Sequence, residues 1–182
     1  MGTLNPLRSA PARRALASAL RHVRPLRIAL RLATRLIVPR QRVGALAVVL
    51  DGRGRLLLAE HVFRSQYPWG LPGGWLQAGE PPERALAREV REETGLEVQV
   101  LRPLLCAQHG PDSGDETASG LSLVYECRLT GTPEQRARSW ELLDVEWVEP
   151  KEALLRLRRF EQEAVRLVLD VGGAAAAGGA AR

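Results

Sequence analysis

The alternation of hydrophobic and polar positions predicts a β-hairpin, two helices and three further strands between residues 43 and 170. Two apolar runs flank Asp51–Gly54, whose turn-forming residues predict a hairpin over residues 43–63. A polar, glycine-rich stretch predicts a loop over His109–Gly120. The remaining expected elements are a helix over Pro82–Thr94 stopped by Gly95, strands over Leu96–Cys106, Leu121–Leu129 and Trp140–Val148, and a helix over Lys151–Asp170 broken near Arg159.

In the N-terminal arm, residues 1–41, the residue pattern predicts a separate amphipathic helix between Pro25 and Pro39. Arginines recur there at a spacing of four, at Arg27, Arg31 and Arg35, and apolar residues occupy the other faces. We favour packing of this helix on the body of the protein, with its arginines in water, over peripheral contact with an anionic membrane surface. At the other end, residues 171–182 form a Gly/Ala tail that we expect to be disordered.

The net charge of +5 is unevenly distributed along the chain. Residues 1–42 contain ten arginines and no acidic residue, so the rest of the chain, with 16 basic and 21 acidic residues, is mildly acidic. An acidic body, without aromatic residues interleaved among basic ones, disfavours specific nucleic-acid binding. The two cysteines are far apart in the sequence, which excludes a disulfide scaffold and indicates a reducing compartment, for which we expect the cytoplasm.

One face of the helix over Pro82–Thr94 concentrates negative charge. At about 100° per residue, Glu89, Glu92 and Glu93 lie within about 100° of arc. Carboxylates this close repel one another unless a positive group lies among them, and Mg²⁺ binds carboxylates together with water and substrate phosphate. The spacing therefore predicts a site for a hard divalent cation, preceded by a tight glycine turn.

The residues around this face follow a fixed spacing. Gly74 is followed after five residues by Glu80, and after seven more by the run Arg88-Glu89-Val90-Arg91-Glu92-Glu93-Thr94-Gly95-Leu96. This pattern resembles the Nudix box at each of its defining positions, and it is far more specific than a lone glycine motif. The similarity to the Nudix hydrolases extends over about residues 42–170 and leaves the arm and the tail outside it.

The resemblance implies an α/β/α sandwich around a mixed β-sheet, preceded here by the basic amphipathic helix. It also implies an enzyme acting on phosphorus-containing acid anhydrides, with a nucleoside diphosphate linked to another group as its small-molecule substrate. Such hydrolysis depends on Mg²⁺ or Mn²⁺, and water attacks one phosphorus while the other phosphate leaves. A homodimer is one assembly that we consider.

Roles for individual residues follow from the resemblance. It implies that Glu92 and Glu93 are the principal metal ligands and that Glu89 is either a further ligand or the base acting on the attacking water. It implies that Gly74 offers loop backbone to the metal. The residues expected to support this loop and helix are Gly73, Glu80, Arg88 and Gly95.

Residues outside the motif bear on the substrate. Pro111 lies 15 residues past Leu96, a distance similar to the pattern of ADP-ribose pyrophosphatases, although an ordinary loop proline explains it nearly as well. Glu116, in the acidic loop that follows, is an alternative base to Glu89. Trp69 is a candidate for stacking on a nucleobase.

We therefore expect a metal-dependent pyrophosphohydrolase, with ADP-ribose or a nucleotide sugar placed ahead of a normal or oxidised nucleoside triphosphate. The alternative from another class is a non-catalytic Nudix fold that binds nucleotides. Such domains typically lose a carboxylate of the motif, whereas this chain retains all of them.

Overall fold

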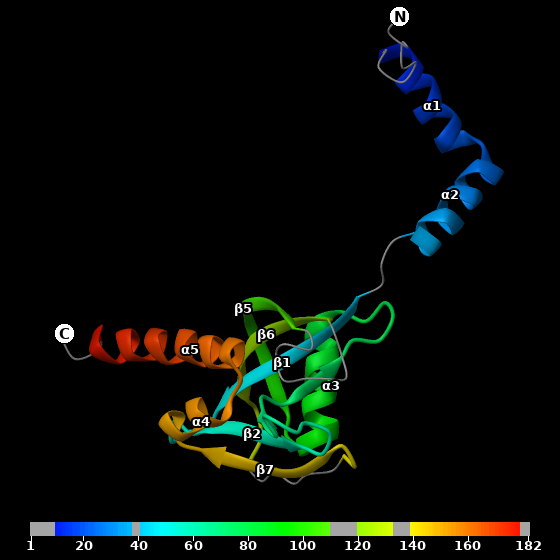
Figure 1. Ribbon diagram of the computed structural model, residues 1–182. Helices are drawn as coiled ribbons and strands as arrows, with labels where there is room; N and C mark the ends of the chain where they lie inside the picture. Colours follow the sequence, from blue (N-terminus) through cyan, green and yellow to red (C-terminus); the bar gives the residue numbers. More distant parts are fainter. Residues whose placement is uncertain (1–9, 38–40, 110–119, 133–138, 179–182) are drawn as a thin grey trace, which may run out of the picture. The chain divides into compact units, whose positions relative to one another are not determined.

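The computed structural model describes residues 10–37, 41–109, 120–132 and 139–178 (Figure 1). The chain divides into two compact units, Met1–Arg40 and Gln41–Arg182. In the first unit the described residues form two helices, α1 (Ala10–His22) and α2 (Arg24–Ile37). No helix among the described residues is both long enough and apolar enough to cross a membrane.

The second unit combines strands and helices in the order that the sequence pattern predicts, with two short additional strands. Its elements are β1 (Arg42–Leu50), β2 (Leu56–His61), β3 (Trp69–Gly70), β4 (Gly73–Trp75), α3 (Pro82–Thr94), β5 (Val98–His109), β6 (Gly120–Leu129), β7 (Leu142–Val148), α4 (Pro150–Arg156) and α5 (Arg159–Gly178). The hairpin formed by β1 and β2, the three later strands and the helix break near Arg159 agree with the prediction.

The strands form one mixed sheet. Its central order is β3-β2-β1-β6-β5, with β4 paired to β1 and β7 paired to β2. The pairing of β1 with β6 is parallel, from Arg42 opposite Gly120 to Leu50 opposite Arg128, and the other pairings are antiparallel. The parallel pair brings together segments that lie far apart in the sequence, on either side of the acidic helix.

Both faces of the sheet are buried, and for this reason β1 and β2 read as nearly continuous apolar runs. Side chains alternate between the faces. Ala45, Ala47 and Val49 of β1 belong to one hydrophobic cluster, whereas Leu46 and Val48 belong to another. The sheet is therefore the middle layer of the domain.

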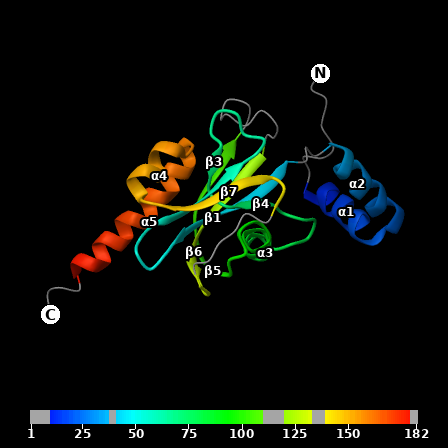
Figure 2. The ribbon, with the colours of Figure 1, turned by 90° about the horizontal axis from the view of Figure 1, so that it is seen from below.

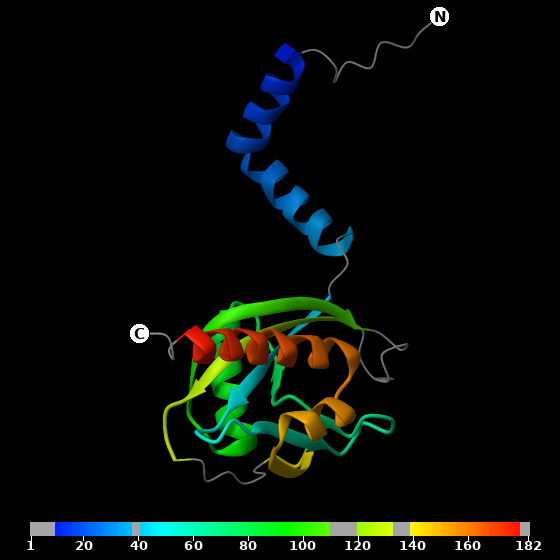
Figure 3. The ribbon, with the colours of Figure 1, turned by 90° about the vertical axis from the view of Figure 1, so that its left-hand side faces the viewer.

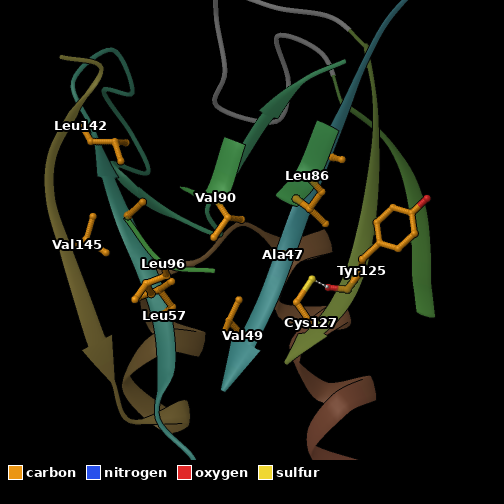
Figure 4. Packing of buried hydrophobic residues seen from close by; sticks show 12 residues of the cluster. Ala47, Val49, Leu57, Leu86, Val90, Leu96, Tyr125, Cys127, Leu142 and Val145 are labelled. Atoms are coloured by element: carbon orange, nitrogen blue, oxygen red, sulfur yellow. Dashed lines mark hydrogen bonds between the residues drawn. The ribbon is translucent and has the colours of Figure 1, made fainter. Parts of the chain in front are cut away.

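Helices cover the two faces from opposite sides (Figures 1 and 3). Leu86 and Val90 of α3 pack into the first cluster together with Ala47 and Tyr125 (Figure 4). Ala164 and other residues of α5 pack into the second cluster. Figure 2 shows α3 end-on, on its own side of the sheet. The expected α/β/α sandwich around a mixed sheet is thus confirmed.

Helix α3 has the bounds that its sequence predicts. Pro82 stands at the first helical position, where its missing N–H has no consequence for the helix. Gly95 follows the last turn in the left-handed conformation, with φ of 76°, and donates its N–H to the carbonyl oxygen of Arg91. Local chemistry therefore determines both ends of the helix. Packing of its apolar side on the sheet then determines the direction of its acidic face.

The structure differs from the sequence prediction in the arm, where α1 precedes the one expected helix, and at two places in the second unit. Strands β3 and β4 have two and three residues, too few for an alternation pattern, and they exist through pairing with β2 and β1. Helix α5 runs to Gly178, past the expected end at Asp170 and into the segment expected to be disordered. The alanines of that segment have high helix propensity, which explains the extension.

Candidate active site

The turn between β3 and β4 brings backbone close to backbone. Gly73 has φ of 138°, and a Cβ atom built on it would lie 2.1 Å from the carbonyl oxygen of Ala45 in β1. Only glycine fits there, because a side chain would collide with rigid backbone. The close approach lets β4 pair with β1 and directs the N–H of Gly73 toward α3.

Glu93 accepts that N–H. Its Oε2 lies 2.8 Å from the nitrogen of Gly73, and the side chain is buried on the sheet-facing side of α3. Burial, together with the nearby negative charges of Glu89 and Glu141, raises the pKa of Glu93 to about 7, against the opposing effect of the Gly73 hydrogen bond. A carboxylate in this setting gains from a nearby cation, which would favour its charged form.

Glu89 lies one turn earlier and contacts the same loop. A Cβ atom on Gly74 would lie 2.7 Å from the carboxyl carbon of Glu89, so the bare glycine gives this carboxylate its space. Desolvation raises the pKa of Glu89, although the neighbouring Arg88 acts in the opposite direction. The loop glycines and the helix are therefore fitted to each other around two carboxylates.

Arg88 holds the loop and the helix together. Its Nε and Nη2 donate to the two carboxylate oxygens of Glu80 at 3.0 and 2.9 Å. Its Nη1 donates to Glu89 at 2.7 Å and to Glu92 at 3.2 Å. These charge-assisted hydrogen bonds lower the pKa of Glu80 and raise the pKa of Arg88. One arginine thus joins the loop carboxylate Glu80 to two carboxylates of the acidic face.

The three carboxylates expected to bind metal do not meet at one point. Within the described part of the chain, no three His, Cys, Asp or Glu side chains converge into a metal-binding group. Glu93 faces the cavity described below, as does Glu89, whereas the side chain of Glu92 is 60% exposed and paired with Arg88. Two partly desolvated carboxylates with raised pKa values nevertheless form a donor set that suits a hard divalent cation.

A cavity of about 380 Å³ lies next to these carboxylates. Its size is that of a small-molecule site. Its charged lining residues are equally divided between acidic and basic types: Glu89, Glu93 and Glu141, and Arg42, Arg64 and Arg158. A ligand that combines negative charge with a bound cation matches this lining better than an apolar ligand does.

Several of the lining residues have no counterpart in the sequence prediction. His61 ends the buried strand β2 and Arg64 follows it, a place where polar residues often reach a site, so their position offered a weak signal. Arg158 lies between α4 and α5 and offered no local signal, because its position depends on how α5 docks on the sheet.

The aromatic residues are placed differently from the sequence prediction. Trp69 does not line the cavity; it packs against the second hydrophobic cluster, and the guanidinium group of Arg156 lies 5.2 Å from its ring centroid. Trp75 instead lines the cavity and is 38% exposed. Pro111 and Glu116 lie outside the described residues.

Comparison with known proteins fits this arrangement. Residues 40–168 match the model of the NUDIX domain, which covers most of the chain. The chain belongs to the Nudix family. The match begins just before β1 and ends within α5, so the sheet, the acidic helix and the cavity of this Nudix hydrolase all lie inside it.

Two relatives show the range of names among similar Nudix proteins. The chain is 34% identical over 137 residues to a MutT-like protein of Streptomyces ambofaciens, which covers 75% of this chain and 80% of that protein. It is 33% identical over 126 residues to an ADP-ribose pyrophosphatase of Mycobacterium tuberculosis, and this alignment covers 66% of this chain and 59% of that protein.

A solved structure supports the same conclusion. The MutT NUDIX hydrolase from Burkholderia pseudomallei aligns with a TM-score of 0.58 and 27% identity, over 71% of this chain and 99% of that one. The family match and the hydrolases among its relatives identify the chain as a pyrophosphohydrolase.

Proposed function

We propose that this Nudix hydrolase cleaves the diphosphate of a nucleoside diphosphate derivative, with ADP-ribose or a nucleotide sugar as the preferred substrate. The observation that carries the proposal is the cavity, in which two carboxylates of α3 and three arginines face one space. A diphosphate is attracted to arginine, and a divalent cation joins it to the carboxylates. The similarity to an ADP-ribose pyrophosphatase supports the preference for that substrate class.

Glu92 and Glu93 would hold the Mg²⁺ or Mn²⁺, together with backbone of Gly74, and Glu89 would be either a further ligand or the base. The exposed Glu92 side chain is free to leave Arg88 for the cation, since surface ion pairs contribute about 1 kcal/mol or less. When bound, the cation supplies charge neutralisation and polarises the phosphorus–oxygen bond that breaks.

The chain itself supplies orientation and proton transfer. The Arg88 bond to Glu80 fixes the loop against α3, and the Gly73 N–H fixes the Glu93 carboxylate. As the base, Glu89 would take a proton from the attacking water, and Glu116 is the alternative base. A single substitution separates these roles, because removal of the base lowers turnover while cation binding persists.

Hydrolysis of a substrate panel tests the proposal. The panel contains ADP-ribose, nucleotide sugars, dinucleotides, and normal and oxidised nucleoside triphosphates, each with Mg²⁺ or Mn²⁺ at mildly alkaline pH. Phosphate release after a coupled phosphatase step reports turnover. We expect the highest kcat/KM with ADP-ribose or a nucleotide sugar; a clear preference for triphosphates would contradict the substrate class, and silence across the panel would contradict hydrolysis.

A matched pair of variants tests the site. Glu92→Gln removes the charge of an expected metal ligand, and we expect turnover to fall by about 1,000-fold or more while the fold is retained. Glu97→Gln makes the same chemical change at an exposed residue just beyond the motif and should leave kcat unchanged. Equal activity in the two variants would exclude Glu92 from the site.

A further inference from the structure

A second group of charged side chains lies at the same cavity, outside the acidic motif. Arg158 and Glu161 are buried at the junction of α4 and α5, at 5% and 0% exposure. The carboxylate of Glu161 accepts from Nη2, Nε and the backbone N–H of Arg158 at 2.9, 3.2 and 3.0 Å. Arg64, from the segment after β2, lies 3.9 Å from the same carboxylate. Glu161 therefore fixes the position of one cavity arginine and lies beside another.

The main chain is also shaped to hold Arg64. A Cβ atom on Gly70 of β3 would lie 2.1 Å from Nη1 of Arg64 and 3.2 Å from Oε1 of Glu161. The absence of a side chain at Gly70 lets the guanidinium group lie against the strand. Two elements far apart in the sequence, β3 and α5, meet beside Arg64 and thus place the two arginines before any ligand arrives.

His61 lies in the positive electrostatic potential of Arg64 and Arg158. Burial, together with the positive charges of Arg64 and Arg158, lowers the pKa of His61 to about 2. The imidazole therefore stays neutral, and the surrounding potential disfavours added positive charge. Its Nε2 is buried at the cavity and has no hydrogen-bond partner among the described residues. Buried polar atoms of this kind are normally satisfied by protein, ordered water or a ligand, and the cavity that His61 lines is the side from which a phosphate oxygen would approach it.

We propose that His61, Arg64 and Arg158, positioned by Glu161, form an anion subsite that takes one phosphate group of the substrate. The proposal rests on the proposed function, because it assigns a further part of the same cavity. In this arrangement the carboxylates of α3 bind through a cation, whereas the subsite binds phosphate directly. Glu161 touches Arg158 and not the ligand, so it is a positioning residue.

The subsite predicts phosphate binding without a divalent cation. Calorimetric titration of the full chain with inorganic pyrophosphate, in EDTA and at low ionic strength, measures this directly. We expect the wild-type protein to bind pyrophosphate and AMP but not adenosine, because the phosphate is the recognised group. Binding of pyrophosphate but not AMP would assign the subsite to the released phosphate product, whereas absence of pyrophosphate binding by the wild type would overturn the proposal.

Two variants locate that binding. Arg64→Gln removes one charge and should weaken pyrophosphate binding by about 10-fold or more. Gly70→Ala keeps every charge but pushes the flexible end of Arg64 aside, so we expect a smaller loss, about 3-fold. Arg156→Gln, which removes an arginine that pairs with Glu146 and Glu152 outside the cavity, is the control and should bind as the wild type does. Wild-type affinity in both Arg64→Gln and Gly70→Ala would exclude the subsite even if Arg158 variants fail to fold.

Substrate kinetics separate this proposal from the proposed function. We expect Arg64→Gln and Gly70→Ala to raise KM by factors similar to their loss of pyrophosphate affinity, with a smaller change in kcat. Hydrolysis with unchanged KM in both variants would support the function and exclude the subsite. Arg64-dependent pyrophosphate binding by a protein that hydrolyses no member of the panel would support the subsite and exclude the function.

Discussion

Glu93 and Glu161 are both buried glutamates beside one cavity, yet they are stabilised differently. Glu161 accepts three hydrogen bonds from Arg158 and is 0% exposed. Glu93, at 7% exposure, accepts the N–H of Gly73, and no arginine hydrogen-bonds to it in the described ranges. Glu161, whose charge is paired with Arg158, therefore holds that arginine in place. Glu93, to which no arginine is bonded in the described ranges, is available to an external cation.

The largest expected contrast comes from the same substitution at both positions. Glu93→Gln should lower kcat by about 1,000-fold or more while the free energy of unfolding stays within about 1 kcal/mol of wild type at mildly alkaline pH. Glu161→Gln removes the buried charge that accepts three hydrogen bonds from Arg158 and should lower the free energy of unfolding by about 3 kcal/mol or more. Kinetics and denaturant unfolding measure the two effects; equal destabilisation by both substitutions would remove the distinction.

The pH dependence of stability tests the assignment at Glu93 more finely. Since its pKa in the folded protein is about 7, above the ordinary 4.5, the folded state retains a proton that the unfolded chain releases between these values. This contribution to stability is fully present below about 4.5 and is lost as the pH rises through about 7. Mg²⁺ competes with that proton, so its effect on Tm should be larger one unit above pH 7 than one unit below.

Glu93→Gln is the control for this titration. The amide has no proton to lose in this range, so both the loss of stability through about pH 7 and the pH dependence of the Mg²⁺ effect should diminish. Thermal unfolding across the pH range, with and without Mg²⁺, provides the measurement. An unchanged profile in Glu93→Gln would assign the titration to another group.

A smaller effect is expected from the loop that contacts the acidic helix. Gly74→Ala places a Cβ atom 2.7 Å from the carboxyl carbon of Glu89, so this carboxylate must move. We expect kcat to fall by about 10-fold or more with little change in Tm, because the displaced group is a side-chain end. In Gly131→Ala the new methyl group meets nothing within 4 Å, and kcat should be unchanged.

The smallest expected effect concerns the end of α3. Gly95→Ala forces alanine into the left-handed conformation, which costs about 1 kcal/mol. The free energy of unfolding should fall by that amount, as measured by denaturant unfolding. A larger loss would show that the cap also determines the placement of the acidic face.

The sequence predicted those features that depend on nearby residues. Pro82 and Gly95 determine the ends of α3, and the spacing of Glu89, Glu92 and Glu93 places them on one face. A helical wheel does not give side-chain directions, however, and Glu92 is bonded to Arg88 and exposed to solvent rather than lining the cavity.

Features that depend on tertiary docking were missed. Arg158 reaches the cavity because α5 packs on the sheet. The sequence around Arg158 does not indicate that it lies beside the cavity. Strands β3 and β4 are too short for a periodic signal and are defined by their partners. Cys106 lies within an apolar run, a pattern that predicts burial, but it is exposed on β5, which is at the edge of the sheet.

The parallel pairing of β1 with β6 has a consequence for how the protein is made. Arg42 pairs with Gly120, and both Gly44 of β1 and Ser122 of β6 line the cavity. A nascent chain on the ribosome can therefore form the hairpin and the acidic helix early, but it cannot close the cavity until β6 has emerged, and Arg158 follows later still. Such pairing between distant segments slows folding. During synthesis, the acidic face of α3 is thus exposed before the arginines that line the cavity beside it.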